Sequence, residues 1–156
     1  MLRLEIPGRG TWTVEHLVLD FNGTLAVDGR LSGGVKEALK ELAGILKIYV
    51  LTADTYGTAK RECDGVPAEV VVVDPLDGGS AKLAFVEKLG PEQTAAVGNG
   101  YNDAKMLARA ALGILVLGPE GAAGAALAAA DVVVPTALDA LTLLLNPKRL
   151  AATLRR

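Results

Sequence analysis

The sequence predicts an α/β fold, a three-layer α/β/α doubly wound domain in which helices cover both faces of a mainly parallel sheet. Short apolar runs rich in β-branched residues recur along the chain, and helical patterns separate them. Buried parallel strands form such continuous runs because both of their faces are covered. No internal repeat divides the chain, and 156 residues fit one domain, residues 1–156, since domains commonly contain roughly 100–200 residues.

The N-terminal residues differ from the rest of the chain. Leu2–Ile6 and Thr11–Val14 flank the turn sequence Pro7-Gly8-Arg9-Gly10, which predicts a β-hairpin. We expect this hairpin at an edge of the sheet, leading into the first core strand. That strand, Leu17–Asp20, is expected at the centre of the sheet.

A second, very short hairpin is expected after the first core strand, because the turn dipeptide Asp28-Gly29 separates Thr24–Val27 from Arg30–Leu31. Helices and strands alternate from there. The expected helices, several of which begin at a capping residue, are 34–43, 55–63, 81–89, 103–110, 122–129 and 137–144. The remaining strands are expected at 46–51, 70–73, 94–97, 113–117 and 132–134.

Composition and charge exclude several classes of protein. No apolar run approaches the roughly 20 residues that cross a bilayer, and the N-terminus lacks a secretory signal, so we expect a cytoplasmic protein without membrane association. The net charge of −2 supplies no basic field for nucleic acid. The one basic cluster, Lys148-Arg149 with Arg155-Arg156, lies at a C-terminus that we expect to be frayed. The single cysteine, Cys63, excludes an intrachain disulfide.

Polar side chains gather where the predicted strands end. Ligands of a doubly wound sheet bind outside the carboxyl ends of its strands. Three strands end in the polar runs Asp20-Phe21-Asn22-Gly23-Thr24, Thr52-Ala53-Asp54 and Gly98-Asn99-Gly100-Tyr101-Asn102-Asp103. Lys82 lies near the start of the helix that precedes the last of these strands. The sequence therefore predicts one crevice that contains carboxylates, a hydroxyl, a lysine and side-chain amides.

This set of groups suits phosphoryl transfer. A carboxylate can attack phosphorus, but it repels a phosphate dianion unless a divalent cation and an ammonium screen the two charges. Mg²⁺ suits this task because it prefers hard oxygen ligands such as carboxylates. Thr52 and Lys82 can each bind a phosphoryl oxygen, and glycines such as Gly23 let backbone N–H groups come close.

Four motifs together resemble those of the haloacid dehalogenase-like (HAD) superfamily. They are Asp20-x-Asn22-Gly23-Thr24, Thr52, Lys82 and Gly98-x-Gly100-x-Asn102-Asp103, and the resemblance extends from residue 16 to about 145. One such motif is weak, whereas four in the right order, each at a predicted strand end or helix start, are specific. Within the superfamily the chain looks most like a soluble, stand-alone phosphorylation domain of P-type ATPases, because Thr52-Ala53-Asp54 is similar to their Thr-Gly-Asp.

The resemblance implies a role for each motif residue. Asp20 would be the nucleophile that becomes an aspartyl-phosphate, and Asn22 and Lys82 would complete the catalytic group. The residues implied to bind the phosphoryl group are Gly23, Thr24, Thr52, Ala53, Lys82 and Asn102. The implied cofactor is Mg²⁺, and its implied ligands are Asp20, the Asn22 backbone carbonyl, Asn99 and Asp103.

Two asparagines depart from the family pattern. Most HAD phosphatases carry an aspartate as general acid and base two residues after the nucleophile, where this chain has Asn22. Losing one such group typically lowers a rate by about 10²–10⁴-fold. Asn99 stands where the family supplies a metal-binding aspartate, which removes one negative charge from the metal site. We therefore expect slow turnover and weakened metal binding.

The spacing of the motifs leaves no room for a cap domain. About 30 residues separate Asp20 from Thr52, and a similar number separate Thr52 from Lys82. An uncapped site would accept a phosphorylated substrate, including a macromolecular one, or be covered by a neighbouring subunit of a dimer or tetramer.

Three hypotheses about function follow. The first is a Mg²⁺-dependent phosphohydrolase or phosphotransferase that acts slowly through Asp20. The second is a degenerate phosphate- and Mg²⁺-binding regulatory domain with little catalysis. The third is a soluble ATPase, which is weakened because only Ala26–Leu31 stands where P-type enzymes insert their nucleotide-binding domain.

Overall fold

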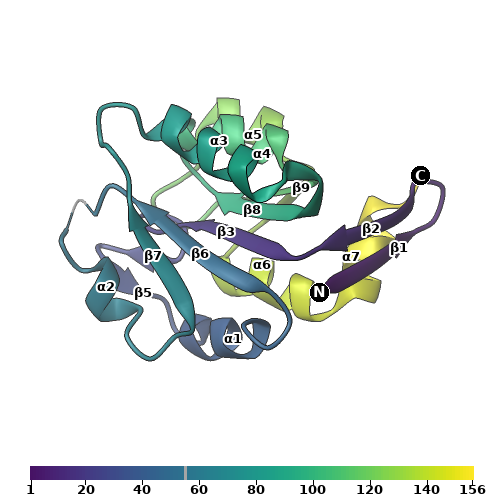
Figure 1. Cartoon of the computed structure of the whole chain (residues 1–156), viewed down its shortest axis with the longest axis horizontal. Coiled ribbons are helices and arrows are strands. Elements are labelled where there is room, and N and C mark those ends of the chain that lie inside the picture. Colours follow the sequence, from purple (N-terminus) through teal and green to yellow (C-terminus); the bar gives the residue numbers. More distant parts are fainter. Residues whose placement is uncertain (55) are drawn as a thin grey trace.

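The computed structural model describes residues 1–54 and 56–156, and its core is a six-stranded parallel sheet (Figure 1). The strands lie in the order β10-β9-β8-β3-β6-β7, and every neighbouring pair is parallel. In chain order they are β3 (His16–Asp20), β6 (Lys47–Thr52), β7 (Ala68–Val72), β8 (Thr94–Gly98), β9 (Leu112–Val116) and β10 (Val132–Val134). The predicted fold class and the central position of the first core strand are confirmed.

The chain builds this sheet outward from β3 in two directions. It first passes to β6 and β7 on one side, and then returns to the other side of β3 to form β8, β9 and β10. The direction of winding reverses between β3 and β8. A crevice for ligands opens at such a switch point, beyond the carboxyl ends of the two strands.

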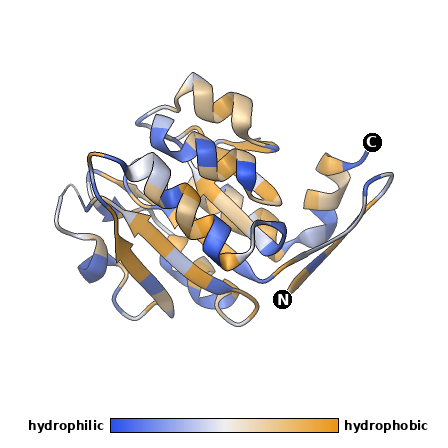
Figure 2. Ribbon diagram, turned by 45° about the horizontal axis from the view of Figure 1, so that its top comes forward, coloured by the Kyte–Doolittle hydropathy of each residue, from blue (hydrophilic) through white to orange (hydrophobic). Residues whose placement is uncertain are grey.

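Helices cover both faces of the sheet and complete the three layers. One face carries α3 (Gly78–Leu89), α4 (Ala104–Arg109) and α5 (Gly124–Ala129), and the other carries α1 (Val35–Leu42) and α6 (Ala137–Leu145) (Figure 1). Strand β3 packs against both layers because successive side chains point to opposite faces. Leu17 and Leu19 lie in one buried core, and Val18 lies in the other. The strands of the sheet are largely apolar, as Figure 2 shows.

Most predicted helices appear within a few residues of their expected bounds. The helix expected over residues 55–63 is shorter, since α2 covers Ala59–Glu62. Thr55, where that helix was expected to begin, lies outside the described residues. Two 3₁₀ turns, η1 (Pro91–Gln93) and η2 (Tyr101–Asp103), precede β8 and α4. Within the described part of the chain, no helix has the length and apolar character needed to cross a membrane.

The N-terminal hairpin is present, but its predicted place at an edge of the central sheet is wrong. β1 (Leu2–Ile6) and β2 (Gly10–Val14) form a two-stranded antiparallel sheet of their own. Figure 1 shows this hairpin projecting from the end of β3. β2 is separated from β3 by Glu15 alone, so the hairpin extends that strand beyond the sheet.

The C-terminus is not frayed, because α7 (Pro147–Leu154) packs on the hairpin. Proline suits the first position of a helix, where its missing N–H is not needed. The buried apolar face of α7, which includes Leu150 and Leu154, covers alternate residues of β1 such as Leu4. Our prediction failed here because a short amphipathic helix is stable only with the tertiary surface that it covers.

The second hairpin consists of β4 (Ala26–Val27) and β5 (Arg30–Leu31). Its turn residues Asp28 and Gly29 have φ values of 52° and 77°. A two-residue type I′ turn requires positive φ at both positions, and the Asp-Gly dipeptide suits it for that reason. Between β3 and α1 the chain thus forms only a small hairpin, which agrees with the absence of a cap.

Candidate active site

The polar runs converge at the switch point of the sheet. Asp20, Thr52 and Gly98 are the last residues of β3, β6 and β8, which are neighbours in the order β8-β3-β6. Because these strands are parallel, their carboxyl ends meet at one edge. The structure brings the strand-end motifs together in one place, as the sequence predicts.

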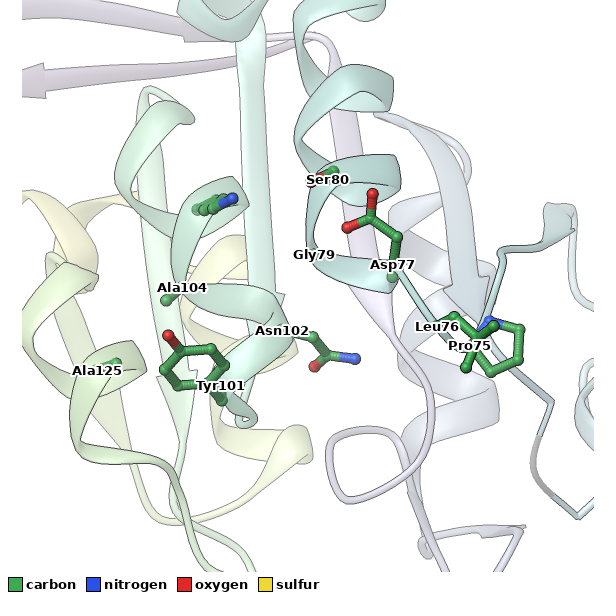
Figure 3. A pocket seen from close by; sticks show the side chains of 11 residues that line it. Pro75, Leu76, Asp77, Gly79, Ser80, Tyr101, Asn102, Ala104 and Ala125 are labelled. Atoms are coloured by element: carbon green, nitrogen blue, oxygen red, sulfur yellow. The ribbon is translucent and has the colours of Figure 1, made fainter.

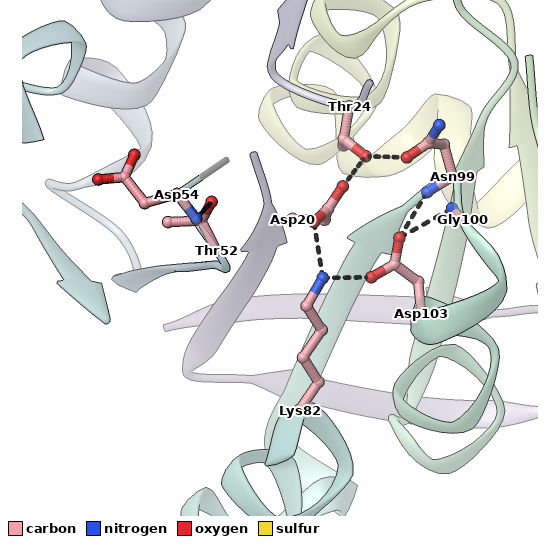
Figure 4. Close-up of polar contacts among 8 residues, drawn as sticks. All are labelled: Asp20, Thr24, Thr52, Asp54, Lys82, Asn99, Gly100 and Asp103. Atoms are coloured by element: carbon pink, nitrogen blue, oxygen red, sulfur yellow. Dashed lines mark hydrogen bonds and ion pairs between the residues drawn. The ribbon is translucent and has the colours of Figure 1, made fainter. Parts of the chain in front are cut away.

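Lys82 joins two carboxylates in the centre of the site. Its Nζ lies 2.6 Å from Asp20 Oδ1 and 2.7 Å from Asp103 Oδ1 (Figure 4). The exposed fractions of Asp20, Lys82 and Asp103 are 7%, 1% and 0%. Removing such charges from water is costly unless each has a partner, so the three residues depend on one another.

Asp103 also fixes the loop after β8. Its second oxygen, Oδ2, accepts hydrogen bonds from the backbone N–H groups of Asn99 and Gly100, each over 2.9 Å. A Cβ atom at Gly98 would lie 2.6 Å from Asp103, so only glycine fits beside this carboxylate. Both oxygens of Asp103 are thus used by donors of the protein.

Thr24 links Asp20 with Asn99. The Thr24 hydroxyl lies 2.8 Å from Asp20 Oδ2 and 3.1 Å from Asn99 Oδ1. The Asn99 side-chain NH₂ donates to the Gly121 carbonyl over 2.9 Å, which orients its Oδ1 toward the site. Gly23 has φ of +79°, and a Cβ there would lie 2.6 Å from Asn99 Nδ2. The Gly23 position therefore requires glycine for both conformation and space.

Asn22 contributes an amide that is only partly satisfied. Its Oδ1 is buried and has no hydrogen-bond partner among the described residues. A buried acceptor without a donor costs free energy, and native proteins rarely contain one. Asn22 follows Asp20 by two residues, and its unpartnered oxygen can accept from a ligand donor or bind a cation.

Thr52 and Asp54 form a turn at the end of β6. The Asp54 N–H donates to Thr52 Oγ1 over 2.8 Å, and Asp54 Oδ1 accepts from the Ala59 N–H over 3.0 Å. Asp54 therefore holds the start of α2, in a left-handed conformation with φ of 52°. Thr52 is 1% exposed, and since its oxygen accepts from Asp54, its hydroxyl hydrogen can point to a ligand. Ala53 lies between the two and is half-buried.

Asn102, like Thr52, is a predicted site residue that lies outside the hydrogen-bonded network around Lys82. The Asn102 side chain is exposed and lines a cavity, whose side chains Figure 3 shows. The structure records no hydrogen bond from this side chain to the other described site residues. By contrast, Asp20, Thr24, Lys82, Asn99, Gly100 and Asp103 form one hydrogen-bonded network.

Burial changes the proton affinities of the charged residues. The pKa of Asp20 is raised from its ordinary 3.8 to about 6, because burial disfavours the carboxylate and Asp103 repels it, against the opposing effects of Lys82 and Thr24. Burial acts to lower the pKa of Lys82, but the carboxylates of Asp20 and Asp103 outweigh it and raise that pKa. Lys82 is therefore cationic at neutral pH, and Asp20 is ionised above about pH 6.

The oxygen atoms of the site suit a hard cation. Within residues 1–54 and 56–156, no group of three His, Cys, Asp or Glu side chains is placed to hold a metal. Only two carboxylates, those of Asp20 and Asp103, belong to the network, and Asp103 is fully engaged. Asp20, Asn22 and Asn99 can still supply carboxylate and carbonyl-type oxygens, the ligands that Mg²⁺ and Ca²⁺ accept. The donor set thus fits a hard divalent ion, held with less negative charge than two or three carboxylates would give.

Sequence reasoning missed how Asp103 is used. The pattern Gly98-x-Gly100-x-Asn102-Asp103 placed Asp103 near the site, but its spacing does not reveal a contact with Lys82, 21 residues earlier. The capping role of Asp54 is the ordinary one for a short polar residue before a helix, and its bond to the Ala59 N–H agrees with it.

Comparisons with known proteins agree with this architecture. The family model for haloacid dehalogenase-like hydrolases matches residues 3–111. An uncharacterized protein of Methanocaldococcus jannaschii is 47% identical over 79 residues, which make up 48% of this chain and 85% of that protein. A copper-exporting P-type ATPase of Staphylococcus aureus is 32% identical over 96 residues. This match spans 60% of the chain but only 12% of the ATPase.

Solved structures with the same fold include two phosphatases. The 3-deoxy-D-manno-octulosonate 8-phosphate phosphatase of Moraxella catarrhalis, solved with magnesium, phosphate and KDO, has a TM-score of 0.71 at 17% identity, over 90% of this chain and 92% of that one. A putative enzyme of the same name from Vibrio cholerae has a TM-score of 0.72 at 14% identity, over 96% and 97% of the two chains. At these identities the likeness concerns the fold.

Proposed function

The chain belongs to the haloacid dehalogenase-like hydrolase family, and on this premise we propose that it is a Mg²⁺-dependent phosphohydrolase or phosphotransferase that forms an aspartyl-phosphate on Asp20. One observation carries the proposal. The Asp20 carboxylate ends the central strand at the switch point and contacts the buried ammonium of Lys82. That arrangement supplies a nucleophile together with a cation that can neutralise an incoming phosphate.

The reaction proceeds in two substitutions at phosphorus. An ionised Asp20 oxygen bonds to phosphorus while the bond from phosphorus to the leaving oxygen breaks, and that oxygen leaves as an alcohol once it gains a proton. Water, or another acceptor hydroxyl, then attacks phosphorus and the bond to Asp20 breaks. Lys82 stays charged and binds a phosphoryl oxygen, and the Thr52 hydroxyl donates to another.

Mg²⁺ would be held by the Asp20 carboxylate, the Asn22 backbone carbonyl and Asn99 Oδ1. When bound, the ion screens the repulsion between the Asp20 carboxylate and the phosphate. Asp103 could join these ligands only by giving up its bonds to Lys82 or to the backbone of Asn99 and Gly100. We therefore assign Asp103 the role of positioning Lys82 and the loop after β8.

Asn22 determines the speed of this chemistry. A carboxylic acid at this position would protonate the leaving oxygen and later accept a proton from water, whereas an amide can do neither. The leaving oxygen must then take its proton from solvent, and the attacking water must release its proton to solvent. We expect slow turnover, and a phosphoenzyme that accumulates when water attack is the slower step.

A regulatory domain that binds Mg²⁺ and phosphate with little catalysis is the second candidate. The observation that favours it is the pair Asn22 and Asn99, which removes both a proton-transfer group and a metal-binding charge. A soluble ATPase is the third candidate and rests on the match with the copper-exporting ATPases. The ATPase candidate is weakened because the small hairpin β4–β5 occupies the segment after the first motif, where P-type enzymes insert their nucleotide-binding domain.

Hydrolysis of p-nitrophenyl phosphate tests the proposal. Wild type should release nitrophenol slowly in the presence of Mg²⁺ and lose this activity with EDTA. Asp20→Asn should be inactive, whereas Asp64→Asn, which removes an exposed acid outside the site, should match wild type. Phosphorylation of Asp20 by acetyl phosphate, detected by intact mass, would support the aspartyl-phosphate. Activity that survives in Asp20→Asn would overturn the mechanism, and phosphate binding without turnover would favour the regulatory domain.

A further inference from the structure

A cavity of about 350 Å³ is lined by Asn102, the residue that precedes Asp103. It lies between the start of α3 on one side and η2 with the start of α4 on the other, and Figure 3 shows its lining side chains. Small-molecule sites commonly have volumes of roughly 300–1,000 Å³, so this cavity can hold one compact organic group. None of the three charged residues of the network lines it.

Apolar side chains at the rim of the cavity are unusually exposed. Leu76 is 94% exposed and Tyr101 is 79% exposed, the two highest values among the large apolar side chains of the described residues. They stand on opposite sides of the cavity, on the loop before α3 and on η2. Exposed apolar groups gathered at a concave site mark a place where burial by a ligand is favourable.

The walls of the cavity are the same two turns that position the charged residues. Gly78 and Gly79 begin α3, and Lys82 follows Gly78 by one helical turn. A Cβ atom at Gly79 would lie 3.4 Å from the Asn102 backbone oxygen, so the two turns touch here. Asn102 lines the cavity and directly precedes Asp103. Asn102 thus links the cavity in sequence to Asp103, which contacts Lys82.

We propose that this cavity binds the leaving group of the substrate and favours an aryl group, so that the protein acts preferentially on aryl phosphomonoesters. The inference rests on the proposed function and deepens it. Tyr101 offers a ring for offset or edge-to-face contact, and Leu76 offers an apolar surface opposite to it. Gly78 and Gly79, which carry no side chains, also line the cavity. Lys105 and Asp77, also at the cavity, can bind polar substituents of that ring.

Equilibrium binding by calorimetry in Mg²⁺ separates this inference from the proposed function. The ligands are phenyl phosphate, glycerol phosphate and inorganic phosphate. The variants are Tyr101→Ser and Leu76→Ser, with Ile45→Ser as a matched control, because Ile45 is an exposed apolar residue before β6, at the opposite end of that strand from the site. Inorganic phosphate occupies the site without entering the cavity, so its affinity reports whether each variant keeps an intact phosphate site.

We expect wild type to bind phenyl phosphate more tightly than glycerol phosphate. Each cavity variant should weaken phenyl phosphate by about 2- to 10-fold, the range of one aromatic or apolar contact, and leave inorganic phosphate unchanged. Ile45→Ser should change neither. Equal affinities for the two esters, or a preference that survives in both cavity variants, would overturn the aryl site while the proposed function stands. Failure of all three ligands to bind, with no hydrolysis, would overturn the proposed function and this inference together.

Discussion

The site has two halves that use their polar atoms differently. In the ionic half, formed by Asp20, Lys82 and Asp103, every carboxylate oxygen accepts a hydrogen bond and the lysine contacts both carboxylates. In the amide half, formed by Asn22 and Asn99, the Asn99 NH₂ donates to the Gly121 carbonyl and its Oδ1 shares the one Thr24 hydroxyl hydrogen with Asp20. The Asn22 Oδ1 is buried and has no hydrogen-bond partner among the described residues. The ionic half is complete in the protein alone, whereas the amide half is not.

This difference indicates that the ionic half is kept for function, although burying its charges lowers stability. Three buried charges cost more to bury than apolar residues of similar volume, so stability alone does not account for them. Perturbed pKa values in a crevice are typical of functional groups, and Asp20 has one. The ionic half therefore supports the phosphate chemistry that we propose, in which the amide half would set the rate and the affinity for metal.

Restoring a carboxylate to the amide half should have the largest effect. Asn22→Asp supplies the missing general acid and base next to Asp20, and we expect hydrolysis of p-nitrophenyl phosphate to rise by about 10²–10⁴-fold. Steady-state assays at saturating Mg²⁺ measure the rate, and intact mass measures the fraction of phosphoenzyme, which should fall.

Two companion variants test the cause of that gain. Asn22→Thr keeps a polar side chain without an acid and should remain as slow as wild type. Asn22→Asp combined with Asp20→Asn should be inactive, because the acid has no nucleophile to assist. If Asn22→Asp is no faster than wild type, the amide is not what limits turnover, and the regulatory domain becomes the better description.

Removing the cation from the ionic half should have the next largest effect. Lys82→Met leaves Asp20 and Asp103 buried without their shared partner, and breaking a buried ion pair commonly costs about 3–5 kcal/mol. Urea unfolding in EDTA at pH 7 measures this loss, which should shrink near pH 5 as Asp20 gains a proton. Lys88→Met, on the exposed part of the same helix, is the matched control and should change the free energy of unfolding little. An equal loss in both variants would mean that Lys82 acts as an ordinary helix residue.

The fold was largely predictable from the sequence because its strands are buried on both faces. Runs such as Leu46–Leu51 then stand out without any knowledge of their neighbours. The Asp28-Gly29 turn was predictable for a different reason, since its backbone conformation depends on those two residues. α7 was missed because its stability comes from packing on β1, a contact between the two ends of the chain.

The location of the site was predictable, but its internal bonding was not. Strand ends in a parallel sheet must meet, which brought Asp20, Thr52 and Asn99 together in the prediction. The use of both Asp103 oxygens depends on side-chain geometry that no spacing encodes. The cavity between Leu76 and Tyr101 could not be predicted for the same reason, because it forms where the start of α3 approaches η2 and the start of α4.

The charge of Asp20 should make stability depend on pH. Its pKa is about 6 in the folded protein and 3.8 ordinarily, so the folded state holds this proton more tightly. The resulting stability is fully present below about pH 4 and is lost as the pH rises through about 6. Asp20→Asn lacks this loss, so its free energy of unfolding should exceed that of wild type at pH 8, and the difference should disappear toward pH 4. Urea unfolding in EDTA from pH 4 to pH 8 measures the difference.

The sign of that difference in free energy shows whether the cost of burying the Asp20 charge or its contact with Lys82 dominates stability. If Asp20 mainly stabilises Lys82, Asp20→Asn should destabilise the protein at every pH. Asp64→Asn, at an exposed position, should show no such trend. Added Mg²⁺ should stabilise wild type at pH 8 and leave Asp20→Asn unchanged, since binding to the folded state alone raises stability.

Asn99→Asp should have the smallest of these effects, and its sign should depend on metal. The Asn99 NH₂ group donates to the Gly121 carbonyl, and a carboxylate would instead place an acceptor against that carbonyl. Losing this bond should cost about 1–3 kcal/mol in EDTA. Mg²⁺ should offset the loss, because a second carboxylate strengthens its binding. Asn102→Asp adds the same charge on an exposed side chain in the same loop and should lose little stability in EDTA. If Asn99→Asp is as stable as wild type without metal, the Asn99 amide does not anchor the loop at Gly121. Stability then gives no reason for an amide at position 99.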